Sequence, residues 1–373
     1  MTKNNSTTRT IAFALAIFLV FLPTFSFALV NEEGVDKFRK SVNSILSNTC
    51  LRKNNYGVKI YSLDRGETLY EIRSKQLFIP ASNAKVLTTA VALKYLGSNY
   101  RFSTEFYTDG ILENDTLKGN LYIKGSGDPK LVTEQLWLIV NELRNLPIKK
   151  IKGNIIADDS FFDNQKRIKT WIKNPGAQAY EAPLGALSFN FNTVKVYVSP
   201  GGKVGDRPGI VIEPENEYIK LENNAQTLRP GKLRRLIVNR VDKEDHDLIT
   251  VSGGINIGQP RTHYFLNITN PTQYALSVFK SYIDLSGITF DGQLQHGKVP
   301  DDAMELYIHE GEPLALALRG LNKFSNNFVA EQILKTIGGE HLGLPGSTKK
   351  GLLVFQEYMQ QLGYGPEQYS IFD

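Results

Sequence analysis

The sequence predicts an α+β protein in which a helix-rich domain, made of both ends of the chain, is interrupted by a large strand-rich segment. Two observations lead to this prediction. Apolar residues recur at the helical spacing of about 3.6 toward both ends of the chain. Between about residues 101 and 305, short segments alternate apolar and polar side chains and are separated by Gly, Asn and Pro turns, which is typical of half-buried strands.

The first 28 residues have the features of a secretory signal peptide. Lys3 and Arg9 form a positive head, residues 11–22 form an apolar run, and residues 26–28 offer a small-x-small cleavage site. The alternative is an uncleaved anchor, although the apolar run is near the lower limit for a membrane span. We therefore expect a cleaved signal peptide, a periplasmic protein and no stable transmembrane anchor.

The next hundred residues predict a helix, a hairpin and a second helix. Apolar spacing indicates a helix over residues 31–47, and the runs 57–63 and 68–72 flank a turn, as in a β-hairpin. Pro80 then opens a helix that ends near Gly97.

The segment after residue 101 predicts strands with two helices among them. The expected strands are residues 102–108, 116–124, 151–158, 194–199, 236–241 and 248–255, and the expected helices are residues 132–143 and 272–285. Helical spacing returns at residues 314–319, 326–337 and 346–362. We therefore expect one domain made of residues 29–100 and 306–373, interrupted by inserted domains over residues 101–305.

Composition excludes several classes of function. The formal net charge is +5, and no dense Lys/Arg patch carries interleaved aromatic residues, so nucleic acid is not an expected partner. Cys50 is the only cysteine, which leaves no internal disulfide. The five histidines are scattered without the spacing of metal ligands, so we expect neither a metal site nor another cofactor.

One candidate nucleophile stands at the start of the second predicted helix. Ser82 and Lys85 form a Ser-x-x-Lys motif, and positions i and i+3 of a helix lie on one face. A neutral lysine amine can act as the base for a serine hydroxyl without a histidine. Neutrality near pH 7 requires that the lysine pKa fall by roughly three units, which burial and a second cation can achieve.

The motif alone does not decide between a nucleophile and a solvated helix cap. Residues 277–280 and 347–350 also read Ser-x-x-Lys. Ser-x-Asn, a second short motif, occurs at residues 41–43, 188–190 and 325–327. Only Ser82 follows an apolar strand and a proline that opens a helix.

A longer resemblance favours the nucleophile. Residues 78–93, which read Phe-Ile-Pro-Ala-Ser-Asn-Ala-Lys-Val-Leu-Thr-Thr-Ala-Val-Ala-Leu, are similar to the nucleophile helix of the class C low-molecular-mass penicillin-binding proteins. Residues 321–334 resemble the second motif of that family, a group of D-Ala-D-Ala carboxypeptidases and endopeptidases. Residues 121–131, 153–163 and 180–190 resemble its inserted domains. The resemblance implies a transpeptidase/β-lactamase-like domain with an insertion.

The resemblance also implies roles for five residues. Ser82 attacks the carbonyl of the D-Ala-D-Ala bond of a peptidoglycan stem peptide, and Lys85 takes its proton. Ser325 relays a proton to the leaving amine, and Asn327 holds the substrate amide and contacts Lys85. Asp158 contributes to recognition of the stem-peptide side chain; the alternative is a carboxylate that caps a turn at a strand end. β-Lactams are expected inhibitors, because they imitate the substrate and leave a slowly hydrolysed ester.

The family's third motif is absent from the sequence. No Lys-Thr-Gly occurs, and residues 335–337 read Lys-Thr-Ile. That motif supplies an oxyanion N–H, and loss of one such donor costs about 10²–10³ in rate. The expectation is therefore a fragment of a longer protein or a truncated gene. The rivals are a non-catalytic peptidoglycan-binding remnant and a serine β-lactamase, although the long insertion argues against the second.

Overall fold

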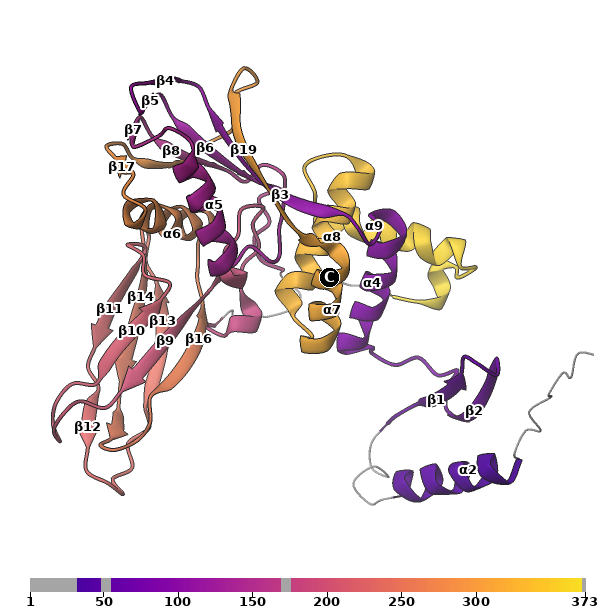
Figure 1. Cartoon of the computed structure of the whole chain (residues 1–373). Helices are drawn as coiled ribbons and strands as arrows, with labels where there is room; N and C mark the ends of the chain where they lie inside the picture. Colours follow the sequence, from indigo (N-terminus) through magenta and orange to yellow (C-terminus); the bar gives the residue numbers. More distant parts are fainter. Residues whose placement is uncertain (1–31, 48–54, 169–175, 371–373) are drawn as a thin grey trace, which may run out of the picture. The chain divides into compact units, whose positions relative to one another are not determined.

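The computed structural model describes residues 32–47, 55–168 and 176–370 (Figure 1). The chain divides into two compact units, Met1–Pro80 and Ala81–Asp373. The predicted signal peptide lies outside the described residues. None of the helices in the described ranges is long and apolar enough to cross a membrane.

The first unit contains a helix and a two-stranded hairpin. Helix α2 (Glu32–Leu46) is followed by β1 (Val58–Ser62) and β2 (Glu67–Ile72), which pair antiparallel. Arg39 on α2 donates a hydrogen bond of 2.8 Å to the carbonyl of Leu69. The helix and hairpin that the sequence predicts here are therefore confirmed.

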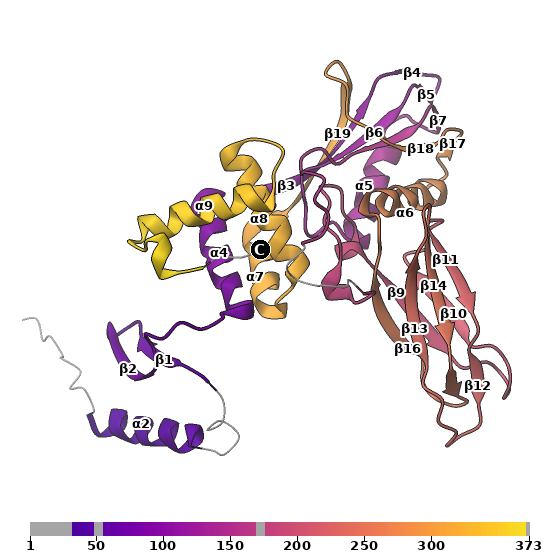
Figure 2. The same ribbon diagram turned by 180° about the vertical axis from the view of Figure 1, so that it is seen from behind.

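The helical part of the second unit is built from both sides of the insertion. It consists of the 3₁₀ turn η1 (Ala81–Asn83), α4 (Ala84–Tyr95), α7 (Leu314–Phe324), α8 (Asn327–Leu342), α9 (Thr348–Gln361) and the 3₁₀ turn η4 (Pro366–Gln368). Helices α4, α7 and α8 lie side by side in both views (Figure 1, Figure 2). Helix α4 packs with α7, α8 and α9. The domain expected over residues 29–100 and 306–373 stays a prediction.

A mixed five-stranded sheet opens the inserted region. Its order is β18-β8-β6-β3-β19, with strands β3 (Arg101–Thr108), β6 (Leu121–Gly125), β8 (Ile155–Asp158), β18 (Leu294–His296) and β19 (Met304–Pro313). Strands β6, β8 and β18 run parallel, whereas β3 pairs antiparallel with both of its neighbours. A smaller sheet has the order β17-β7-β5-β4, with β4 (Ile111–Glu113), β5 (Thr116–Lys118), β7 (Lys150–Lys152) and β17 (Thr289–Phe290).

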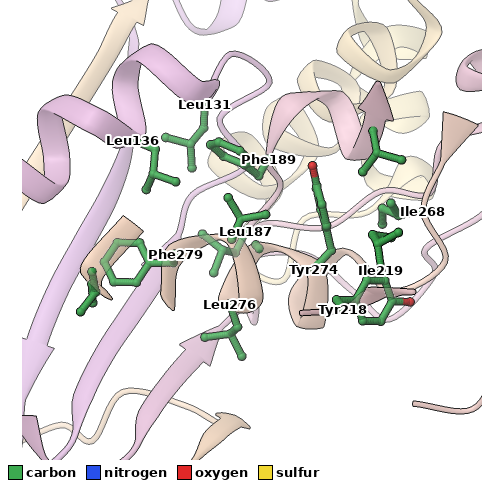
Figure 3. Close-up of a cluster of buried hydrophobic side chains, with 14 of the residues drawn as sticks. Leu131, Leu136, Leu187, Phe189, Tyr218, Ile219, Ile268, Tyr274, Leu276 and Phe279 are labelled. Carbon is green, nitrogen blue, oxygen red and sulfur yellow. The ribbon is translucent and has the colours of Figure 1, made fainter. Parts of the chain in front are cut away.

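Two helices supply much of the core of the insertion. Helices α5 (Thr133–Asn145) and α6 (Pro271–Leu285) pack against each other, and their buried side chains join one large apolar cluster. Figure 3 shows part of it, with Tyr274 and Phe279 on α6 and Phe189 from the 180–190 stretch. Tyr274 is fully buried.

Three further small sheets complete the insertion. One has the order β10-β9-β16, one β11-β14-β13 and one β12-β15. Their strands are β9 (Thr193–Ser199), β10 (Gly209–Glu213), β11 (Ile219–Asn223), β12 (Gln226–Leu228), β13 (Ile237–Asp242), β14 (Asp247–Ser252), β15 (Gly254–Asn256) and β16 (Thr262–Asn267). Short 3₁₀ turns, η2 (Ala179–Glu181) and η3 (Asn190–Asn192), precede β9. The predicted α+β class is confirmed.

Three predicted strands are each divided at a glycine, and their halves join different sheets. These are the runs 116–124, 151–158 and 248–255. Gly119 and Gly153, which divide the first two, have φ angles of 152° and 158°. A Cβ atom on Gly153 would lie 2.1 Å from the carbonyl oxygen of Gly119, so the two backbones approach closely there. Gly253 divides the third run with a φ of 87°, which favours glycine. Alternation of apolar residues continues across such a break, so the pattern alone does not reveal it.

Candidate active site

Ser82, Lys85 and Asn327 meet through the lysine amine. Lys85 Nζ lies 3.3 Å from Ser82 Oγ and donates a hydrogen bond of 2.8 Å to Asn327 Oδ1. Lys85 and Asn327 are 242 residues apart in the chain. The fold thus brings the Ser-x-x-Lys and Ser-x-Asn motifs together at one point.

Ser82 lies in η1, the 3₁₀ turn that leads into α4. The sequence predicts this serine in the first turn of the helix, whereas α4 begins two residues later, at Ala84. Ala81, the first residue of this turn, has a φ of 47°, in the left-handed region, so no regular α-helix passes through it. A 3₁₀ turn at a helix start keeps residues i and i+3 adjacent, so the contact between Ser82 and Lys85 is retained.

The second motif occupies the junction between α7 and α8. Ser325 ends α7 with φ 54° and ψ 40°, a left-handed conformation that turns the chain sharply. Asn326 then caps α8, because its side-chain oxygen accepts a hydrogen bond of 3.2 Å from Val329 N. Asn327 is the first residue of the helix. Ser325 is exposed and lies at the same junction, two residues before Asn327, which contacts Lys85.

A buried apolar layer holds the helices that carry these residues. Val91 and Ala92 of α4 are fully buried, and they belong to one cluster with Leu321 of α7 and Phe328 of α8. Asn322 also donates a hydrogen bond of 3.0 Å to Thr89 Oγ1 and so links α7 to α4. Packing on several helices therefore limits movement of Lys85 relative to Asn327.

Burial lowers the pKa of the Lys85 amine below its ordinary value of 10.5. The negative charge of Glu331 works in the opposite direction and raises that pKa. The net direction is downward, which increases the fraction of neutral amine, the form that can accept a proton.

The exposure of the two side chains suits nucleophilic chemistry. Ser82 is exposed and therefore open to a substrate, whereas Lys85 is half-buried and partly shielded from water. A neutral Lys85 in this position can accept the hydroxyl proton of Ser82 as the oxygen attacks a carbonyl. The arrangement is thus suited to acyl transfer by a serine hydroxyl with a lysine base.

Asp158 ends β8 and has different partners. Its Oδ1 accepts a hydrogen bond of 2.9 Å from Ser160 N, and its Oδ2 accepts one of 2.9 Å from Val299 N. The side chain is buried, with 3% of the residue exposed. Asp158 therefore caps the strand end and has no hydrogen bond to the other four predicted site residues. Its role in recognition stays a prediction.

Glu331 is a neighbour of the site that the sequence prediction missed. It lies on α8 four residues after Asn327, which places both on one face of the helix, and it is 8% exposed. The i, i+4 spacing was visible in the sequence, but its burial and its effect on Lys85 depend on the packing of α4 against α8. Among the described residues, no three or more His, Cys, Asp or Glu side chains gather into a possible metal site.

The chain matches one protein family over most of its length. Residues 38–372 match the family described as D-Ala-D-Ala carboxypeptidase 3 (S13). Both motifs of the site fall within this range.

Two curated relatives have related names. The chain is 28% identical over 347 residues to a D-alanyl-D-alanine carboxypeptidase of Actinomadura sp. (strain R39), a match that covers 90% of this chain. It is 23% identical over 317 residues to the D-alanyl-D-alanine carboxypeptidase DacB of Haemophilus influenzae, covering 83% of this chain. The match spans 64% of the length of each relative.

A solved structure shares the fold. Penicillin-binding protein 4 (dacB) of Haemophilus influenzae superposes with a TM-score of 0.71 at 23% identity, over 83% of this chain and 68% of that one. The same protein complexed with a β-lactam gives a TM-score of 0.66 at 22% identity, over 83% of this chain and 67% of that one. At this identity the likeness shows the fold alone.

Proposed function

Because this chain belongs to the D-Ala-D-Ala carboxypeptidase 3 (S13) family, we propose that it is a serine-type D-Ala-D-Ala carboxypeptidase or endopeptidase that acts on peptidoglycan stem peptides. The observation that carries the proposal is the contact of Lys85 with both Ser82 and Asn327. Family membership agrees with the resemblance of residues 78–93 and 321–334. The names of the two relatives support the same reaction class.

In the proposed mechanism, neutral Lys85 accepts the proton of Ser82 as Oγ attacks the carbonyl of the D-Ala-D-Ala bond. Ser325 passes a proton to the leaving D-alanine amine, and the C–N bond breaks to leave an ester on Ser82. Asn327 holds the substrate amide. It also orients Lys85, because its Oδ1 accepts a hydrogen bond of 2.8 Å from the lysine amine. Water then hydrolyses the ester, and the enzyme is regenerated.

A β-lactam enters the same scheme as an inhibitor. Its ring carbonyl takes the place of the substrate carbonyl, and the opened ring stays attached to Ser82 as an ester. The β-lactam complex of the Haemophilus influenzae protein supports this extension by likeness. We place the reaction in the periplasm, on the basis of the signal-peptide pattern in residues 1–28. Asp158 is proposed to contribute to recognition of the stem-peptide side chain.

A second candidate function uses the same fold without chemistry at Ser82. The second candidate is a peptidoglycan-binding protein without turnover. It differs from the first in one measurable respect: it binds purified peptidoglycan and forms no acyl-enzyme.

Covalent labelling with a penicillin separates the two candidates. Purified protein is incubated with the penicillin and its intact mass is measured, alongside Ser82→Ala. We expect an adduct of one penicillin that is absent in Ser82→Ala and retained in Ser347→Ala, a control from another Ser-x-x-Lys stretch. A folded protein that takes up no penicillin, yet sediments with peptidoglycan, would establish the second candidate instead.

A further inference from the structure

A lysine is buried inside α8, on the side of the helix that faces the insertion. Lys335 is 1% exposed, and its amine donates hydrogen bonds of 2.6 Å to Asp163 Oδ1 and 2.7 Å to the carbonyl of Gln165. The same amine lies 5.4 Å from the centre of the Phe162 ring. All three partners belong to residues 158–166, which are the last residue of β8 and the loop after it. We name these residues the strand-end segment.

Other contacts fasten the same segment. Gly346 N donates a hydrogen bond of 2.7 Å to the carbonyl of Phe161, and Asp163 N donates one of 2.9 Å to the carbonyl of Gly346. Gly346 itself lies against α8, because a Cβ atom there would be 2.4 Å from the carbonyl oxygen of Lys335. The strand-end segment is therefore held to α8 both directly and through Gly346.

A second buried polar side chain on α8 reaches a neighbouring part of the insertion. Gln332, one turn before Lys335, is fully buried and donates a hydrogen bond of 2.9 Å to the carbonyl of Gly185. The loop at Gly185 is in turn tied to the strand-end segment, because Leu184 N donates a hydrogen bond of 2.7 Å to the carbonyl of Lys166. Two polar side chains of one helix thus hold two adjoining loops.

Stability alone does not account for a lysine at this position. Removal of an ammonium group from water is costly, and replacement of a buried ion pair by apolar side chains is often neutral or stabilising. An apolar contact is not directional, whereas two short hydrogen bonds from one amine specify where their acceptors lie. The feature that Lys335 adds is a defined position for the strand-end segment.

That position connects the two parts of the proposed site. α8 begins with Asn327, which contacts Lys85, and Lys335 lies eight residues further along the same helix. At a rise of 1.5 Å per residue, the helix places the lysine about 12 Å from Asn327 along its axis. The strand-end segment begins with Asp158, the residue proposed to recognise the stem-peptide side chain.

We infer that Lys335 is a positioning residue, which holds the strand-end segment at a defined place relative to α8 and thereby sets how well substrates with extended side chains are recognised. The inference rests on the proposed function. Lys335 does not touch the reacting atoms. Its loss lowers discrimination between substrates and leaves the reaction of Ser82 with a compact reagent intact.

The first test needs no catalytic activity. Amide hydrogen exchange of residues 159–166 is compared by mass spectrometry in wild type, Lys335→Met and Asp163→Asn. We expect exchange in this segment to become about tenfold faster in both variants, because each removes the ion pair that closes it. Lys280→Met is the control, since Lys280 is another ion-paired lysine on a helix, α6, with the carboxylates of Glu217 and Asp284 as its partners. Unchanged exchange in both variants would overturn the inference.

The second test measures selectivity. Acylation rate constants are measured for a β-lactam with a compact side chain and for one whose side chain carries a charged group like that of a stem peptide. In Lys335→Met we expect about a tenfold lower rate constant for the second reagent and no more than a twofold change for the first. We expect the double variant that combines Lys335→Met with Asp163→Asn to have no larger a loss in this rate constant than the more affected single variant, because both changes break the same interaction.

The outcomes separate this inference from the proposed function. An equal loss for both reagents means that Lys335 supports the whole fold, which overturns the positioning role. If Lys335→Met does not fold, Asp163→Asn gives the same comparison, because its side chain is 30% exposed and the change removes only one charge. A wild-type chain that forms no adduct refutes the proposed function, and the exchange measurement alone then decides whether Lys335 holds the segment.

Discussion

Three stretches of the chain share the pattern Ser-x-x-Lys, and the structure gives each a different environment. At residues 82–85 the serine is exposed, the lysine is half-buried, and the two side chains lie 3.3 Å apart. Burial lowers the pKa of Lys85. This is the only one of the three stretches in which the lysine also contacts the Ser-x-Asn motif, through Asn327.

The stretch at residues 277–280 lies inside α6. Ser277 is 4% exposed, and its hydroxyl oxygen accepts hydrogen bonds of 2.8 Å from Glu217 N and 3.0 Å from Tyr218 N. The hydrogen bond to Asp284 raises the pKa of Lys280, and Glu217 adds to the effect. This serine is a structural acceptor, and its lysine is held in the charged form.

The stretch at residues 347–350 forms a helix cap. Ser347 Oγ accepts a hydrogen bond of 3.1 Å from Lys350 N at the start of α9. Lys350 Nζ donates hydrogen bonds of 2.5 Å and 2.9 Å to the carbonyls of Gly343 and Pro345. The same four-residue pattern therefore makes an amine–hydroxyl pair, a buried acceptor or a cap, and the neighbouring residues decide which.

The largest expected effect concerns the lysines. Lys85→Met removes the proposed base, so acylation by penicillin should slow by about 10²–10⁴-fold. Lys280→Met should keep the wild-type rate, because its amine faces carboxylates away from the site. The measurement is the rate of adduct formation by intact mass. Equal acylation rates for Lys85→Met and wild type would contradict the proposed role of Lys85 as the base, and would leave residues 82–85 no different in this respect from residues 277–280.

The second prediction concerns pH. Because the pKa of Lys85 is lowered, the neutral amine and the acylation rate should both rise with pH through a midpoint below 10.5. Glu331 raises that pKa, so Glu331→Gln should move the midpoint to lower pH. The check is the acylation rate as a function of pH in the two proteins.

The control for this prediction is within the same chain. The pKa of Lys280 is raised, so at a given alkaline pH its amine should react more slowly with an acylating reagent than that of Lys85. Peptide mass spectrometry reports both amines in one sample. A faster reaction of Lys280 at every pH would contradict the assigned environments.

The smallest effects are on stability and compare the two structural serines. Ser277→Ala leaves two backbone N–H donors without their acceptor, which should lower the free energy of unfolding by about 2 kcal/mol. Ser347→Ala removes a helix cap and should cost about 1 kcal/mol. Urea unfolding of each variant is the measurement. A larger loss of unfolding free energy in Ser347→Ala than in Ser277→Ala would contradict this prediction.

The sequence by itself predicted much of the local structure. Helical spacing and turn residues located α2, α4, α5, α6, α7, α8 and α9, because local patterns of burial determine these elements. It missed β4, β10–β12 and β16–β19, which are short or only partly buried and therefore alternate weakly. It also joined the strand pairs that Gly119, Gly153 and Gly253 divide.

For the site, motifs and a family resemblance in the sequence predicted roles for Ser82, Lys85, Ser325 and Asn327. The sequence did not show which of the three Ser-x-x-Lys lysines is desolvated. It also did not show that Glu331 raises the pKa of Lys85, or that Lys335 binds the strand-end segment. These properties depend on contacts between residues far apart in the chain, and burial determines both a lysine pKa and the cost of an ion pair. Only the tertiary structure decided them, because desolvation arises from the packing of α4, α8 and the insertion and not from any local pattern.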